Sequence, residues 1–157
     1  MNVPATPDRV HVLMVERKAA SARLAIEALN GSTVEYGLTV VADAAAALNH
    51  LHARRAPSGP PLPDFIFLDL ELPGRSGHLI LADLQADERL REIPVLAMAR
   101  ANRNDLKRLQ DAHWCCCITK PTTVEEFASV VNAIEQLWLP TVMQRRNGKG
   151  GAGGVEE

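Results

Sequence analysis

The chain has 157 residues, with 17 basic and 19 acidic side chains and a formal net charge of -2 at pH 7. This length predicts one domain with room for a hydrophobic core. The even balance of charge argues against a nucleic-acid partner. No apolar run approaches the roughly 20 residues of a membrane helix, and the N-terminus lacks the apolar segment of a signal peptide. We therefore expect a cytoplasmic protein that does not enter a membrane.

The three cysteines are consecutive, at residues 115–117. Neighbouring residues in a strand point to opposite faces, so these thiols do not form a disulfide framework, which fits a reducing compartment. Together with His113 they suggest a metal or redox protein as one alternative. Adjacent strand positions do not encircle a zinc ion, however, so we interpret this segment as a core strand.

Five short apolar segments alternate with five helical segments along the chain. A short apolar run bounded by turn residues is typical of a strand buried on both faces of a parallel sheet. The predicted strands are residues 10–15, 36–42, 65–68, 94–99 and 114–119. The third ends directly at Asp69, which is followed by the loop sequence Leu-Glu-Leu-Pro-Gly. Strand-end residues are where open α/β sheets bind ligands, although an aspartate there also fits a simple loop or cap role.

The helical segments are bounded by recognisable capping residues. The predicted helices are residues 19–29, 44–53, 76–86, 105–112 and 124–138. Asp43 is a suitable N-cap for the second helix. Two overlapping capping boxes, Thr122 with Glu125 and Thr123 with Glu126, precede the fifth.

The segments outside this pattern are interpreted by composition. We expect residues 1–9 to be a flexible lead-in, residues 10–142 to be the folded domain, and the Gly-rich residues 143–157 to be a disordered tail. Residues 54–63 hold four prolines, and we interpret them as a surface insertion rather than a docking loop.

Alternation of strands and helices predicts a doubly wound α/β fold with a parallel sheet covered on both faces. In a five-stranded sheet of the flavodoxin-like kind, with order 2-1-3-4-5, strands one and three are neighbours at the switch point. Their ends carry Glu16 and Asp69, and the fifth strand ends at Lys120. Two carboxylates and one amine are therefore expected at one edge of the sheet.

Three motifs at these strand ends resemble the receiver domain of two-component response regulators. They are VERK at 15–18, LDLELPGRSG at 68–77 and ITKP at 118–121, and the resemblance covers about residues 10–138. It implies a signalling switch rather than a metabolic enzyme.

By this resemblance, a sensor histidine kinase transfers a phosphoryl group to Asp69, and Lys120 contacts the phosphate. Mg²⁺ is implied as the cofactor, held by Glu16, Asp69 and the backbone carbonyl of Glu71, because hard cations prefer oxygen ligands. The resemblance also implies a cis bond between Lys120 and Pro121.

The sequence departs from the family pattern at three positions. Arg17 replaces the second carboxylate of the usual acidic pair, and arginine does not ligate a cation. Either Arg17 enters the pocket and pairs with Asp69, or it turns out to solvent, and the sequence leaves both readings open. Ala99 stands where the family has Thr or Ser, and Cys117 where it has an aromatic residue. We therefore expect a weakened phosphate pocket with weak or absent Mg²⁺ binding.

The segment IEQLWLPTVMQ at 134–144 resembles the C-terminal extension of stand-alone regulators that pair with bacterial phytochrome kinases. That resemblance implies a bacteriophytochrome partner and a homodimer through the face of the fifth helix, with Trp138, Leu139 and Val142 as contacts. The alternative is that Trp138 only covers the end of the core.

Two other functions remain alternatives to phosphate acceptance by a response regulator. One is a receiver-like module that binds other proteins without being phosphorylated. The other is a phosphatase of the haloacid-dehalogenase type, which also uses a strand-end aspartate. Such a phosphatase typically has a second aspartate two positions later, where this chain has Glu71, and the chain lacks room for its cap domain.

Overall fold

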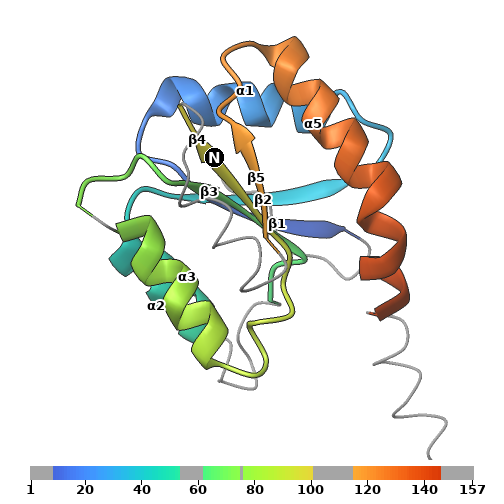
Figure 1. The fold of residues 1–157 in the computed structure, drawn as a ribbon. Helices are drawn as coiled ribbons and strands as arrows, with labels where there is room; N and C mark the ends of the chain where they lie inside the picture. The colour runs from blue at the N-terminus through green and yellow to red at the C-terminus, as the bar shows by residue number, and fades with distance from the viewer. Residues whose placement is uncertain (1–8, 54–61, 75, 101–114, 146–157) are drawn as a thin grey trace, which may run out of the picture.

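The structure of the protein, a computed structural model, describes residues 9–53, 62–74, 76–100 and 115–145. Its centre is a sheet of five parallel strands in the order β2-β1-β3-β4-β5 (Figure 1). The strands are β1 (Val10–Val15), β2 (Tyr36–Val41), β3 (Phe65–Asp69), β4 (Val95–Ala99) and β5 (Cys115–Thr119). The predicted doubly wound α/β fold and its strand order are therefore confirmed.

Helices cover both faces of the sheet, with α1 and α5 on one side and α2 and α3 on the other (Figure 1). Their bounds are α1 (Ala19–Asn30), α2 (Ala44–His52), α3 (Ser76–Ala86) and α5 (Val124–Leu137). Each predicted bound of these elements lies within one residue of the observed one. The predicted helix over 105–112 lies outside the described residues.

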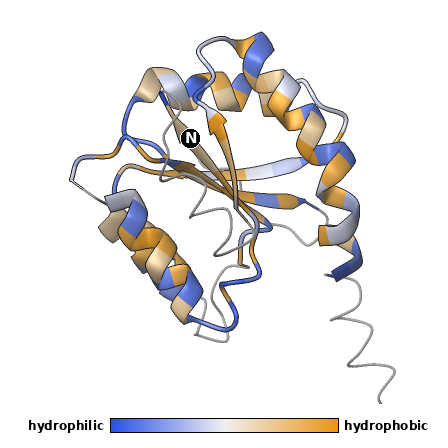
Figure 2. Cartoon of the chain, viewed as in Figure 1, coloured by the Kyte–Doolittle hydropathy of each residue, from blue (hydrophilic) through white to orange (hydrophobic). Residues whose placement is uncertain are grey.

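The central strands are buried on both faces, as the continuous apolar runs predicted. Along β1, Val12 and Met14 belong to the core cluster under α1 and α5, whereas Leu13 and Val15 belong to the cluster under α2 and α3. This alternation follows from the two-residue period of a strand. Figure 2 shows hydrophobic residues through the central strands and hydrophilic residues mainly on helices and loops.

Helix α5 begins as its capping sequence predicted. The side-chain oxygen of Thr123 accepts a hydrogen bond from the Glu126 N–H at 3.0 Å. Three residues at helical spacing, Phe127, Val131 and Ile134, are buried against the sheet. Because these contacts fix the rotation of α5, its remaining faces are left to solvent.

The chain beyond α5 continues as a short helical segment near the end of the sheet where the strands begin (Figure 1). The Trp138 ring stacks on Phe65, the first residue of β3, with 6.0 Å between centroids and 14° between planes. Residues 139–145 are again helical, and Arg145 donates a hydrogen bond to the Glu92 carbonyl at 2.6 Å. We expected the folded domain to end at residue 142, and the ordered helical backbone continues three residues further. Residues 146–157 lie outside the described part of the chain.

Every helix in the described ranges is too short or too polar to cross a lipid bilayer.

We expect Trp138→Ala to lower the free energy of unfolding by about 2 kcal/mol, because it removes the ring that covers Phe65. Leu79→Ala on α3 is the matched control, since Leu79 is 62% exposed. Its effect should stay within about 0.5 kcal/mol. Urea unfolding followed by circular dichroism measures both. Equal losses in the two variants would show that the Trp138 contact does not stabilise the fold.

Candidate functional site

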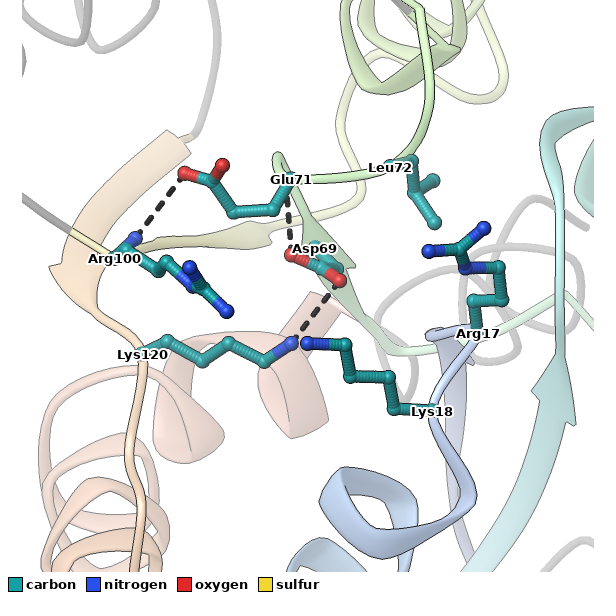
Figure 3. Close-up of a pocket in the computed structure, with 7 residues that line it drawn as sticks. All are labelled: Arg17, Lys18, Asp69, Glu71, Leu72, Arg100 and Lys120. Carbon is teal, nitrogen blue, oxygen red and sulfur yellow. Dashed lines mark hydrogen bonds and ion pairs between the residues drawn. The ribbon is translucent and has the colours of Figure 1, made fainter.

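The carboxyl edge of the sheet brings the three predicted side chains together. Glu16 directly follows β1, Asp69 ends β3, and Lys120 directly follows β5. The Lys120 ammonium lies 3.0 Å from Glu16 Oε1. It also lies 3.1 Å from Asp69 Oδ2 (Figure 3). Neighbouring strands are about 5 Å apart, so lysine has the reach to cross from β5 over β4 to β3.

These three groups form a buried ion triad. The exposed fractions of their side chains are 13% for Lys120, 0% for Glu16 and 4% for Asp69. Burial alone would lower the pKa of Lys120, but hydrogen bonds and charges from Glu16 and Asp69 outweigh it, and the pKa is raised above its ordinary value. The lysine therefore stays positive throughout the physiological pH range.

Each carboxylate of the triad is also held by the backbone two residues further on. The Glu71 N–H donates to Asp69 Oδ1 at 2.9 Å, and the Lys18 N–H donates to Glu16 Oε2 at 3.1 Å. Such local hydrogen bonds are the usual way in which Asp and Glu fix the start of a loop. Both side chains are thus oriented before any ligand arrives.

The loop after Asp69 turns sharply to reach α3. Gly74 has a φ of 67°, a left-handed conformation that favours glycine. At Gly77, an added Cβ would lie 3.1 Å from the Leu70 side chain, so the start of α3 packs closely on the loop. This packing holds the loop beside the triad.

Glu71 makes a contact that sequence reasoning missed. Its Oε2 accepts a hydrogen bond from the Arg100 N–H at 3.2 Å (Figure 3). The sequence assigned Glu71 only a backbone role toward a metal. Instead, its side chain links the loop after β3 to the residue that follows β4.

Arg17 does not pair with Asp69. Its side chain is exposed and its guanidinium extends toward Leu72 at the rim (Figure 3). Arg17 thus lies between the two readings that the sequence left open: it lines the pocket, but its exposed side chain does not pair with Asp69. At the rim the guanidinium keeps its hydration, which it would lose on entering the buried triad.

The remaining predicted positions lie around the triad. Ala99 is buried at the end of β4, Cys117 is half-buried on β5, and Pro121 is buried directly after Lys120. The described residues contain no cis peptide bond, so the expected cis bond between Lys120 and Pro121 is wrong.

A pocket of about 240 Å³ opens above the triad. Its lining side chains from the described part of the chain are Arg17, Lys18, Asp69, Glu71, Leu72, Arg100 and Lys120. Sequence reasoning missed Lys18 and Arg100 as pocket residues. Both lie just after the end of a strand. Because open α/β sheets bind ligands at the carboxyl ends of their strands, the argument that selected Asp69 also applies to these two residues.

No cluster of three or more His, Cys, Asp or Glu side chains suited to a metal ion occurs within the described ranges. The two carboxylates expected to hold Mg²⁺, Glu16 and Asp69, already share the Lys120 ammonium. The residues present are therefore a poor fit for a divalent cation.

A doubly wound sheet with a buried Asp–Lys pair at its carboxyl edge is the arrangement that the resemblance to receiver domains implied. Comparison with known proteins agrees, because residues 12–132 match the family model of the response regulator receiver domain. The chain belongs to this family. It is thus a signalling protein of two-component systems rather than a metabolic phosphatase or a conventional enzyme of another kind.

Three relatives show where in the family this chain lies. Response regulator Rcp1 of Synechocystis sp. is 32% identical over 143 residues, which cover 90% of this chain and 97% of Rcp1. A structure of Rcp1 with Mn²⁺ bound superposes with a TM-score of 0.68 at 30% identity and covers 82% of this chain and 94% of that one. The metal in that structure belongs to Rcp1, a receiver to which this chain is similar.

The phosphorylated cyanobacterial phytochrome response regulator RcpA has a TM-score of 0.72 and 34% identity, covering 85% of this chain and 96% of its own. The bacteriophytochrome response regulator AtBRR has a TM-score of 0.65 and 25% identity, covering 84% and 96%. The chain is thus similar to regulators of phytochrome and bacteriophytochrome systems.

We expect Lys120→Met to lower the free energy of unfolding by about 3 kcal/mol at pH 7, because it leaves two buried carboxylates without their cation. Lys18→Met is the matched control, since Lys18 is exposed. Urea titration measures the free energy of unfolding of both variants. Equal values for Lys120→Met and Lys18→Met would show that the ion triad does not stabilise the fold.

The raised pKa of Lys120 sets the pH dependence of this contribution. The contribution is fully present below the ordinary lysine pKa and is lost as the pH rises through the raised value. The difference between wild type and Lys120→Met should therefore stay constant from pH 7 to about pH 9.

Proposed function

We propose that the protein accepts a phosphoryl group on Asp69 from a sensor histidine kinase. The observation that carries this proposal is the Asp69 carboxylate, which lines an open pocket and lies 3.1 Å from a lysine. A carboxylate in this setting is a nucleophile, and the lysine offsets the negative charge of the incoming group.

The transfer is a displacement at phosphorus. An Asp69 oxygen forms the new P–O bond while the P–N bond to the kinase imidazole breaks. The bonding electron pair stays on the imidazole nitrogen, which then takes a proton. The Lys120 ammonium has three N–H donors, and two of them point at Glu16 and Asp69. The third donor is the one we assign to a phosphoryl oxygen.

We also propose that this pocket binds a phosphoryl group and Mg²⁺ more weakly than an ordinary receiver pocket does. Arg17 supplies no metal ligand, and the Ala99 methyl neither donates nor accepts a hydrogen bond. Cys117 offers no ring to move with a phosphate-bound hydroxyl. The poor fit to a divalent cation supports weak or absent Mg²⁺ binding at Glu16, Asp69 and the Glu71 carbonyl.

A second candidate follows from the same departures. The protein would then work as a receiver-like module that binds its partners without phosphorylation. The observation that favours this alternative is the Lys120 triad, because it satisfies Asp69 without any phosphoryl group. Measuring whether Asp69 takes phosphate separates the two.

We propose a phytochrome-type histidine kinase as the phosphate donor. The similarity to regulators named for phytochromes and bacteriophytochromes supports this choice. The receiver itself has no DNA-binding element in its described residues, so we expect its output to be a protein contact.

We expect incubation with acetyl phosphate to add one phosphoryl mass to the wild-type protein and none to Asp69→Asn. The reason is that the amide is not a nucleophile toward phosphorus. Intact-protein mass spectrometry in Mg²⁺ buffer gives the result.

Arg17→Asp is the companion variant in this experiment, because it restores the missing carboxylate and should raise the Mg²⁺-dependent yield severalfold. An equal mass gain in wild type and Asp69→Asn would rule out Asp69 as the acceptor. No gain in wild type, with a clear one in Arg17→Asp, would favour the phosphorylation-independent module.

We also propose a homodimer through the outer face of α5. The contacts expected from sequence pack mainly on their own chain: Trp138 stacks on Phe65, Leu139 is partly buried, and Val142 is only 5% exposed. Leu137 is the apolar residue of this face that is open to solvent, at 73% exposure. We therefore assign the central dimer contact to Leu137.

We expect Leu137→Glu to shift the protein toward the monomer, because it places a charge in the apolar contact. Sedimentation velocity across a concentration series measures the shift. Leu79→Glu on α3 is the matched control, since Leu79 is 62% exposed but lies outside the α5 face. A sedimentation coefficient that is unchanged in Leu137→Glu would refute this contact.

A further inference from the structure

The rim of the pocket carries cationic side chains that the ion triad does not use. Arg17 and Lys18 come from the loop after β1, and Arg100 directly follows β4. All three side chains are exposed and line the same pocket (Figure 3). Within the described residues, none of their charged groups forms an ion pair.

The charge balance of the pocket therefore favours an anion. Lys120 and the three rim cations face three carboxylates, namely Glu16 and Asp69 in the triad and Glu71 in the loop. Among the described residues, these groups leave one net positive charge before any ligand binds. A divalent cation would enter against this excess, whereas an anion would relieve it.

We infer that the pocket binds a phosphate-type dianion without a metal, with Arg17, Lys18 and Arg100 supplying the positive charge that a divalent cation would supply. This inference rests on the proposed function, because the natural dianion would be the phosphoryl group on Asp69. It goes further in naming the residues that replace the metal.

The local chemistry suits phosphate. Guanidinium groups offer paired N–H donors that match two phosphate oxygens, and lysine adds a point charge. Lys18 is also the N-cap of α1, where no side chain caps the first turn and no acidic residue lies within it. The amino end of this 12-residue helix adds further positive potential beside Lys18. The pocket volume of about 240 Å³ leaves room for a tetrahedral anion.

Glu71 competes with such an anion. Its carboxylate accepts the Arg100 N–H at 3.2 Å, so one donor at the pocket rim is occupied in the anion-free state. A bound phosphate would gain that donor only when Glu71 releases it. Removing the charge of Glu71 should therefore strengthen anion binding, although the same change would weaken a metal site.

The experiment is a titration of the full chain with inorganic phosphate in EDTA, followed by backbone amide shifts in ¹⁵N NMR spectra. We expect saturable binding with shifts at Arg100 and Glu71. Arg17→Ala and Arg100→Ala should each raise the dissociation constant at least threefold. Arg89→Ala is the control, because Arg89 is exposed and does not line the pocket, and its dissociation constant should equal that of wild type.

Two further measurements separate metal-free phosphate binding from binding that requires a divalent metal. Glu71→Gln should bind phosphate at least threefold more tightly than wild type, and added Mg²⁺ should change the wild-type dissociation constant less than twofold. No saturable binding in EDTA, or tightening by tenfold or more on adding Mg²⁺, would overturn the metal-free site. Phosphoryl transfer to Asp69 in Mg²⁺ buffer is measured separately, so the inference can fail while the proposed function stands.

Discussion

The Lys120 ammonium, shared by two buried carboxylates, is the interaction on which the rest of the site depends. It joins residues 104 and 51 positions apart in sequence, at the ends of three different strands. Burying either carboxylate alone would cost several kcal/mol. The pairing becomes possible only because β1 and β3 are neighbours and β5 lies two strands away. The charge pairing in the site therefore depends directly on the order of the strands in the sheet.

The burial of this pairing also explains where the other charges go. The triad of Glu16, Asp69 and Lys120 keeps one net negative charge, but it is closed to water, so a second cation that entered it would lose its hydration. Arg17 lies at the rim, and Lys18 contributes its backbone N–H to Glu16 while its side chain stays exposed. The site thus has a floor with one net negative charge and a cationic mouth.

Sequence patterns predicted the sheet, the helix bounds and the triad for identifiable physical reasons. Continuous apolar runs report strands buried on both faces, and residues directly after such runs must lie at the carboxyl edge. The sequence could not predict the direction of the Arg17 side chain. That direction depends on the contacts of Lys120 with Asp69 and Glu16, which lie 51 and 104 residues away from it. The Glu71 contact was missed for a similar reason, since its partner Arg100 is 29 residues away. The inward packing of Trp138 and Val142 depends on the helical segment that continues after α5, whose buried face the composition of the segment does not reveal.

With the anion binding inferred above, the Glu71 side chain would link the pocket to the surface without the hydroxyl and the aromatic ring expected from the receiver family. Ala99 and Cys117 remove both members of that pair, yet the Glu71 side chain ties the loop after β3 to the residue after β4. A phosphate-type anion bound as inferred above would compete with this carboxylate for the Arg100 N–H, and Glu71 would then no longer tie the loop after β3 to Arg100. Such a receiver would still couple its pocket to its surface without the common switch residues. The Arg100 N–H would exchange the Glu71 carboxylate for the bound phosphate.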